Sequence, residues 1–223
     1  MTSPDSASAG RRRYAAVLLL AVITVVFLIV APTGAASRAI GLVLAGSMLL
    51  IAVLTSRAEL TLRESAAGGV GLVTLAVALA TGLDAIPRPI GSGIGVVVIV
   101  TTIGQLVRGL VRLLRERGVT LQAVAGALAV YLLLGILFAF AVGFAAKVAH
   151  GPYFAQGFDG SESQHVYFSF TSMTTTGYGD LTPATRGGRA LSVLEMLLGQ
   201  IYLVTVISLL VGNLRRGQPN PAP

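Results

Sequence analysis

The 223-residue sequence contains no cysteine, and only 11% of its residues are charged. The absence of cysteine excludes disulfide bonds and thiolate metal sites. A soluble domain carries about 25% charged residues. The low charge, the 54% hydrophobic content and the mean hydropathy of +0.83 therefore indicate an integral membrane protein.

The sequence also lacks the patterns on which enzymes and nucleic-acid-binding proteins depend. It has no nucleophile–base pair, metal cluster or cofactor motif at a useful spacing, and no internal repeat. The glycine-rich stretch 91–95 opens an apolar helix without a preceding strand, so close helix packing explains it better than phosphate binding. The net charge of +7 is spread between apolar segments and forms no nucleic-acid patch. We expect no enzymatic activity, no cofactor and no nucleic-acid partner.

Long apolar runs make up most of the chain. A bilayer core needs about 20 apolar residues per helix. Six segments have this character, namely 14–31, 39–54, 66–83, 90–107, 121–148 and 189–213. A seventh apolar stretch, 164–175, is too short to span and suits a re-entrant helix, which is tolerated where protein or water covers it. The predicted fold class is all-α, a polytopic membrane protein with six transmembrane helices and a re-entrant helix.

Basic residues predict the orientation of these helices. With a cytoplasmic N-terminus, the inner loops carry Arg11, Arg12, Arg13, Arg57, Arg63, Arg108, Arg112, Arg115, Arg117, Arg215 and Arg216. The outer loops then carry Arg38, Arg88, Lys147, Arg186 and Arg189. The positive-inside rule favours this orientation, with both termini in the cytoplasm. The first run could also be a cleaved signal peptide, but it is longer than a usual signal core of about 7–15 residues, which favours an uncleaved helix.

The segment between the last two spans reads Thr174-Thr175-Thr176-Gly177-Tyr178-Gly179-Asp180. This TTxGYGD motif, flanked by apolar spans, resembles the selectivity filter of potassium channels. Neighbouring carbonyls can face one axis only if the backbone dihedrals alternate in sign, and glycine takes positive φ without steric cost. Carbonyl oxygens on that axis replace the hydration shell of the ion. Gly177 and Gly179 fit the positions that need this freedom.

The resemblance implies a K⁺-binding role for four backbone carbonyls and one hydroxyl. The carbonyls belong to Thr175, Thr176, Gly177 and Tyr178, the hydroxyl belongs to Thr175, and Gly179 completes the filter. Residues 121–213 then resemble the two-helix pore module of the potassium channel superfamily, in the order outer helix, re-entrant helix, filter and inner helix. Thr174 and Asp180 flank and support the filter.

Three further residues have expected roles around the filter. Tyr167, ten residues before Gly177, would hydrogen-bond Asp180, or would serve as a packing aromatic. Gly199 matches the hinge glycine of similar inner helices, with close helix packing as the alternative. Glu195, one turn earlier, is a second candidate for the gate. Its carboxyl would accept hydrogen bonds from the base of the re-entrant helix or from a neighbouring subunit, or would face the cavity and attract K⁺, and the sequence does not choose.

A capping box and two histidines lie in or near the segment that leads into the filter. Ser161 and Gln164 form a capping box that starts the re-entrant helix. His150 and His165 are expected outside, near the pore entrance, where solvated side chains are the more common outcome and proton sensing is the alternative.

The predicted organisation has four parts. They are a four-helix transmembrane region (1–107), a cytoplasmic amphipathic linker (108–118), a pore domain (119–216) and a short disordered tail (217–223). The fourth span has no basic residue in its body, which argues against a voltage sensor. The gating stimulus is not readable, and the first four helices would dock on their own pore unit or on a neighbour's.

One filter per chain supplies a quarter of a ring, so the sequence predicts a homotetramer in the lipid bilayer that conducts K⁺ selectively. A weakly selective cation channel and a potassium transporter are alternatives, although such transporters carry four filter loops in one chain. A membrane-anchored interaction protein would leave the filter motif unexplained.

Overall fold

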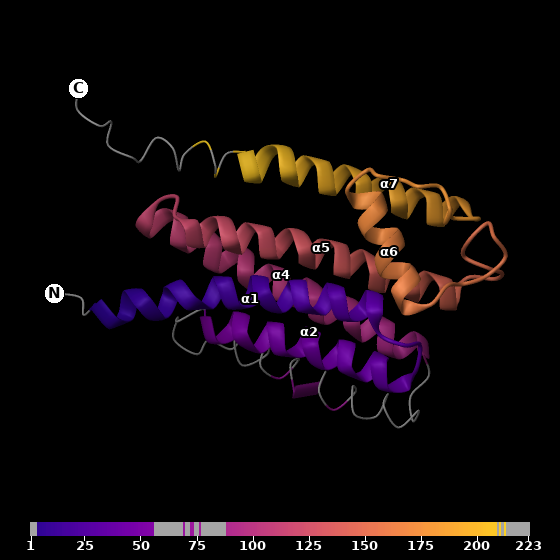
Figure 1. Cartoon of the computed structure of the whole chain (residues 1–223), viewed down its shortest axis with the longest axis horizontal. Helices are drawn as coiled ribbons and strands as arrows, with labels where there is room; N and C mark the ends of the chain where they lie inside the picture. The colour runs from indigo at the N-terminus through magenta and orange to yellow at the C-terminus, as the bar shows by residue number, and fades with distance from the viewer. Residues whose placement is uncertain are drawn as a thin grey trace.

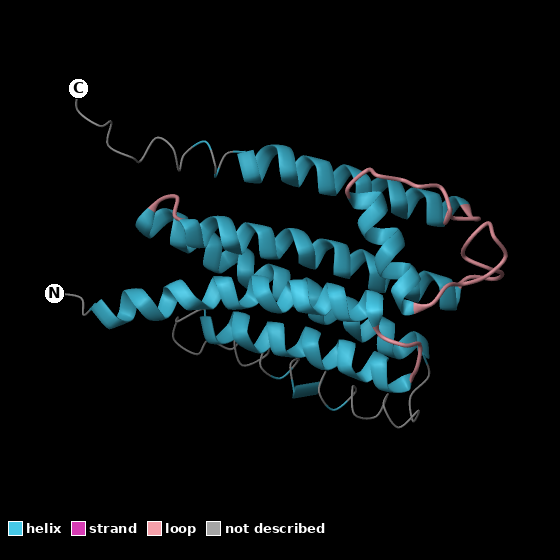
Figure 2. Ribbon diagram, viewed as in Figure 1, coloured by secondary structure: helices cyan, strands magenta, loops and turns pink. Residues whose placement is uncertain are grey.

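The computed structural model describes residues 4–55, 69, 72, 73, 76, 88–208, 210 and 212. Within them the regular structure is helical, which confirms the all-α prediction (Figure 2). The helices are α1 (Pro4–Val30), α2 (Ala35–Thr55), α4 (Arg88–Arg117), α5 (Leu121–Val148), α6 (Glu162–Met173), α7 (Arg186–Ile201) and the π-helical segment η1 (Tyr202–Ile207).

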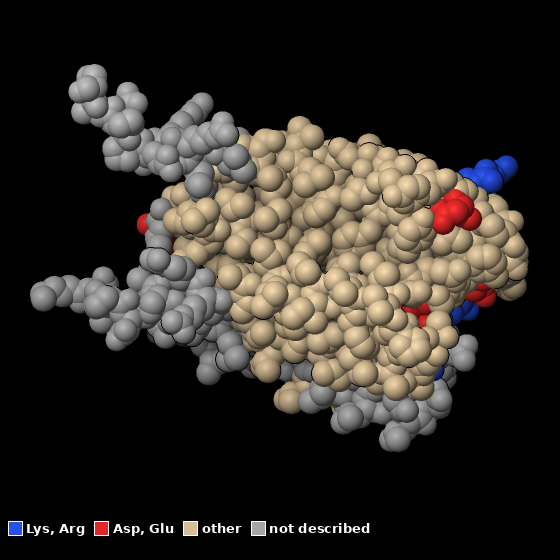
Figure 3. Space-filling view, viewed as in Figure 1, with Lys and Arg blue, Asp and Glu red and all other residues tan. Residues whose placement is uncertain are grey.

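Four helical segments in the described part of the chain are long and apolar enough to cross a bilayer. They are Ala35–Ala52, Ile90–Glu116, Leu121–Val148 and Arg186–Ile207. The apolar part of α1, Tyr14–Val30, is shorter. The predicted third span, 66–83, lies outside the described residues except for isolated positions. In the space-filling view, charged side chains lie at the ends of the molecule, and the middle of the visible face carries none (Figure 3).

Helix α5 begins and ends where the sequence predicts. The Thr120 side chain caps its start by accepting a hydrogen bond from the Ala123 amide. Helix α4 is longer than predicted, because it continues unbroken through residues 108–117 instead of ending at 107. It stops at Gly118, whose φ of 67° is the left-handed conformation that closes many helices. The predicted linker is therefore mostly the last turns of α4, and the domain boundary at 107 stays a prediction.

Helix α5 is the element on which the others pack, because it contacts α1, α4, α6, α7 and η1. Helices α1, α2, α4 and α5 lie side by side along the long axis (Figure 1). Their shared core contains fully buried apolar residues such as Val17, Ile99 and Leu133. Helix α1 begins and α7 ends at one end of this bundle, and the loops on either side of α6 lie at the other (Figure 1).

The N-terminal helices dock on the pore unit of their own chain. Helix α1 contacts both α5 and α6. Buried Leu28 of α1 shares a cluster with Ala139 of α5 and Val166 of α6. These contacts within one chain fit the first of the two docking arrangements considered from the sequence, and docking on a neighbouring copy stays a prediction that a single chain does not test.

Glycines on α5 form notches that receive aromatic rings. A Cβ on Gly135 would lie 2.6–2.9 Å from ring atoms of Phe170 on α6. A Cβ on Gly143 would lie 3.0 Å from Nδ1 of His165, also on α6. Small residues let membrane helices approach closely. These two notches therefore fix how α6 lies against α5.

We predict that Gly135→Ala destabilises the protein by roughly 1–3 kcal/mol, the range for overpacking a filled site. Gly104→Ala is the matched control, because no other described residue has an atom within 4 Å of the added Cβ on α4. It should be neutral or stabilising by up to about 1 kcal/mol through helix propensity. Thermal unfolding in detergent measures both, and equal effects of the two substitutions would contradict the notch.

Candidate functional site

Helix α6 starts at the predicted capping box and is too short to span a bilayer. The Ser161 hydroxyl accepts from the Gln164 amide at 3.3 Å, and Gln164 Oε1 accepts from the Ser161 amide at 2.8 Å. This reciprocal pair confirms the predicted start signal. The helix runs from Glu162 to Met173, crosses between α5 and α7, and leads directly into the 174–180 segment (Figure 1).

The backbone of the 174–180 segment has positive φ at every second residue. The values are 58° at Thr175, 51° at Gly177 and 82° at Gly179. This is the alternation that turns successive carbonyls toward one axis. The two glycines were expected from the sequence, whereas Thr175 was not. A β-branched residue in this conformation is uncommon, and such strain costs of order 1–3 kcal/mol and clusters at functional sites.

The last turn of α6 holds this unusual backbone in place. The Thr171 carbonyl accepts from two amides, Thr176 at 2.9 Å and Gly177 at 3.1 Å. The Ser172 carbonyl accepts from the Thr175 amide at 2.9 Å. Carbonyls at a helix C-terminus have no partner within the helix, so these bonds satisfy them and anchor the segment to α6.

Side chains fasten the base of the segment to both neighbouring helices. The hydroxyls of Thr174 and Thr176 lie 2.9 Å apart, and the Thr174 hydroxyl also donates to the Phe170 carbonyl at 2.7 Å. On the other side, Gln200 Nε2 of α7 donates to the Thr175 hydroxyl at 3.3 Å. The Thr176 hydroxyl therefore has a defined partner.

Tyr167 lies beside Tyr178, and their rings stack at a centroid distance of 6.2 Å and an angle of 4°. Desolvation, followed by the interaction with the Asp180 carboxylate, raises the pKa of the Tyr167 phenol above its usual value of 10.0. The structure thus brings together Tyr167, Tyr178 and Asp180. The stacking of Tyr167 on Tyr178 was not foreseen, and the hydrogen bond between Tyr167 and Asp180 stays a prediction.

The loop before α6 is joined to the chain that follows the 174–180 segment. The Ala155 amide donates to the Thr182 carbonyl at 2.8 Å, and the Ala184 amide donates to the Tyr153 carbonyl at 2.8 Å. The Asp159 carboxylate accepts from the Tyr153 amide at 3.0 Å, which shapes the same loop. These bonds tie the loop before α6 to the residues that follow the 174–180 segment.

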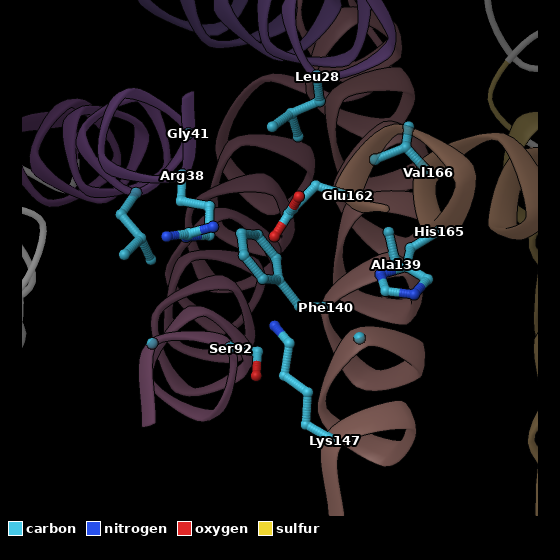
Figure 4. Close-up of a pocket in the computed structure, with 13 residues that line it drawn as sticks. Leu28, Arg38, Gly41, Ser92, Ala139, Phe140, Lys147, Glu162, His165 and Val166 are labelled. Atoms are coloured by element: carbon cyan, nitrogen blue, oxygen red, sulfur yellow. The ribbon is translucent and has the colours of Figure 1, made fainter. Parts of the chain in front are cut away.

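His165 is buried, so the expectation of a solvated side chain is wrong for it, whereas His150 is exposed. The ring occupies the Gly143 notch, and Nε2 lies 2.8 Å from the Asp159 carbonyl. It borders a cavity of about 60 Å³ into which Arg38, Lys147 and Glu162 also project (Figure 4). Burial lowers the pKa of His165 below its usual 6.5, against an opposing effect of the Asp159 carbonyl.

Gly199 packs directly on the end of α6. A Cβ there would lie 2.5 Å from Met173 Cγ and 2.6 Å from the Met173 carbonyl oxygen. Close helix packing is therefore sufficient to explain this glycine. The π-helical segment η1 begins three residues later, at Tyr202, whose hydroxyl donates to the Ala127 carbonyl at 2.8 Å. The hinge role stays a prediction.

Glu195 is fully buried between the helices, where its Oε1 contacts the Ser169 hydroxyl of α6. Ser169 also lies 2.9 Å from the Gly135 carbonyl of α5. The sequence gave no reason to single out Ser169, because a serine within a helix is unremarkable until its partners are known. The gating role of Glu195 stays a prediction.

We predict that mild acid destabilises the protein through His165. The folded-state pKa is depressed, so the stabilisation is complete above the unfolded value near 6.5 and is lost as the pH falls through the folded value. His165→Gln removes the titration and keeps an N–H donor, so its unfolding temperature should fall less between neutral and mildly acidic pH. His150→Gln is the control and should retain the wild-type pH slope. Equal slopes in all three proteins would refute the assignment.

We predict that Gly199→Ala separates α7 from the end of α6 and disturbs the 174–180 segment. Gly187→Ala on the same helix is the control, because nothing in the described part of the chain packs within 4 Å of its added Cβ. The first substitution should cost roughly 1–3 kcal/mol of stability, and the second should leave thermal unfolding nearly unchanged. A Gly199→Ala protein as stable as the wild type would contradict this prediction, because it would show that Met173 moves aside at little cost in free energy.

Comparison with known proteins supports the architecture of this region. A family model described as "Ion channel" matches residues 126–216. The Potassium voltage-gated channel subfamily A member 5 of Rattus norvegicus is 35% identical over 100 residues, which are 43% of this chain and 16% of that protein. The chain thus matches a small part of that relative's length. No solved structure matches.

The matched segment contains α6, the 174–180 segment, α7 and nearly all of α5. The family consists of channels and not of enzymes, in agreement with the sequence-based expectation. Together with the long apolar helices, it identifies the protein as a multi-pass membrane protein. Residues 126–216 are a pore module of the ion-channel family, which confirms the resemblance seen in the sequence.

Proposed function

We propose that the protein is a potassium-selective channel in which four copies each contribute one 174–180 segment to a central filter. The observation that carries the proposal is the alternation of positive φ at Thr175, Gly177 and Gly179. Backbone carbonyls turned to one axis are suited to replacing the water around K⁺. The carbonyls of Thr175, Thr176, Gly177 and Tyr178 and the Thr175 hydroxyl are the proposed ligands.

The exposure of this segment supports an assembly of several copies. Residues 174–180 are all exposed in the single chain, and Tyr178 is 71% exposed. Non-helical backbone at membrane depth is tolerated only where protein buries it or water surrounds it. A homotetramer with cyclic symmetry meets this requirement, because four segments then enclose a narrow aqueous path.

Helix α7 offers an apolar surface for such an assembly. Only 17% of the apolar stretch Arg186–Ile207, which comprises α7 and η1, is buried, against 56% for α5. Exposed apolar side chains on this helix and on η1 are Val193, Leu194, Leu197, Leu198, Ile201 and Val204. In the proposed tetramer these side chains pack against neighbouring copies and line the lower pore.

The electrostatics of the site favour a cation. The C-terminal end of α6, where the filter segment begins, carries the negative pole of the helix dipole, worth about 0.3–1 kcal/mol when exposed. Asp180 adds a carboxylate beside the filter, and fourfold repetition would strengthen this field. The positive-inside count places this end outside the cell and both termini in the cytoplasm.

A weakly selective cation channel is the second candidate, because Thr176 stands where an apolar residue is common. Its hydroxyl lies 2.9 Å from that of Thr174, so it has a hydrogen-bond partner within its own chain. This contact favours selective conduction. A potassium transporter is less well supported, since the chain carries one filter segment.

Potassium flux into liposomes, with sodium as competitor, tests the proposal. Gly177→Ala should abolish flux, because Gly177 has a φ of 51° that alanine adopts poorly, although none of the described residues obstructs its Cβ. Gly187→Ala, which has a free helical Cβ position, should keep flux within about twofold of wild type since nothing is displaced.

Equal sodium and potassium flux would shift the assignment to the weakly selective channel. Potassium flux that survives Gly177→Ala would contradict the proposed filter. A mass measurement in detergent that gives anything other than four copies would contradict the assembly.

A further inference from the structure

Glu195 lies at a junction of three helices without a charged partner among the described residues. Its side chain is 0% exposed and extends from α7 toward Ser169 of α6. Its second oxygen, Oε2, is buried and has no hydrogen-bond partner in the described part of the chain. An ionised carboxylate in such a place pays a large desolvation cost that nothing nearby repays.

The number of protons available at Ser169 indicates which protonation state of Glu195 fits the geometry. The Ser169 hydroxyl has one proton but two oxygen neighbours, the Gly135 carbonyl at 2.9 Å and Glu195 Oε1. A carbonyl can only accept. When the Ser169 hydroxyl donates its proton to the Gly135 carbonyl, a hydrogen bond between Ser169 and Glu195 requires a proton on the Glu195 carboxyl. If the carboxyl is ionised, Ser169 can donate to only one of its two neighbours, and the other oxygen pair has no proton between its atoms.

The titratable group that faces this site is Tyr153 of the outer loop. Burial raises the pKa of the Tyr153 phenol above its usual value of 10.0, so it is neutral near physiological pH. The other side chains at the site, Ser169 and Ser192, are uncharged. No neighbouring charge in the described structure therefore compensates an ionised Glu195.

We propose that Glu195 is a neutral carboxylic acid that donates its proton to Ser169, and that this bond is a latch that positions the pore helix α6 on the inner helix α7. Loss of the proton to hydroxide leaves a buried carboxylate and breaks the Glu195–Ser169–Gly135 chain. Glu195 is a positioning residue, because it acts on the filter through α6.

The latch lies one helical turn from a second contact between the same helices. Ser169 and Glu195 form the first contact, and Met173 and Gly199, each four residues further on, form the second. The carbonyls of Thr171 and Ser172, which anchor the filter amides, lie between these two contacts along α6. Separation of α6 from α7 at Glu195 would therefore loosen the anchor of the filter.

Infrared spectroscopy of the protein in bilayers tests the protonation state directly. We expect a C=O stretching band of a neutral carboxyl at neutral pH, which Glu195→Gln removes and Glu116→Gln retains. Glu116 is the matched control, because it is exposed and paired with Arg112. Ser169→Ala leaves the carboxyl in place and should shift the band, so the assignment does not depend on the folding of Glu195→Gln. Absence of the band, or a band that neither Glu195→Gln nor Ser169→Ala alters, would overturn the proposal.

The effect on conduction rests on the proposed function and is measured separately as potassium flux against pH. Wild-type flux should be lost at alkaline pH, whereas Glu195→Gln should keep its flux, because its amide donates to Ser169 without titrating. Ser169→Ala should reduce flux at neutral pH. Equal alkaline loss in wild type and Glu195→Gln would overturn the role of the latch. Absence of flux in every protein at every pH would contradict the channel, while the infrared result still decides the state of Glu195.

Discussion

The alternating backbone of Thr175, Gly177 and Gly179 is the constraint on which the rest of the pore unit depends. A chain in this conformation gives up regular hydrogen bonding and holds a threonine at a φ of 58°. It persists only where the surroundings fix it. The end of α6 does so through the carbonyls of Thr171 and Ser172, so the position of α6 determines the geometry of the segment.

Helix α6 is in turn held by packing that begins far away in the sequence. Gly135 of α5 receives Phe170, and α7 supplies Glu195 and Gly199 from its other side. Helix α1 adds Leu28 to the outer half of this interface. Within the described residues, helix α1 therefore packs against both α5 and α6 and adds to the contacts that hold α6.

The sequence was most informative where function depends on local backbone properties. Gly177 and Gly179 marked the positive φ positions, and Ser161 with Gln164 marked the start of α6, because both features are set within a few residues. The bounds of α5 followed from a continuous apolar run. The burial of His165, the partner of Ser169 and the conformation of Thr175 were not predictable, since each depends on contacts between distant segments. The continuation of α4 was missed because arginines on an exposed helical face resemble a separate linker.

The central claim is that four copies turn the carbonyls of residues 175–178 toward one axis and hold dehydrated K⁺ there. Anomalous diffraction from crystals of the assembled protein grown in rubidium tests it most directly, because Rb⁺ substitutes for K⁺ and can be located without bias. The account predicts a column of rubidium peaks on a fourfold axis at the level of these carbonyls. Filter segments that do not share an axis, or an axis without rubidium, would contradict it.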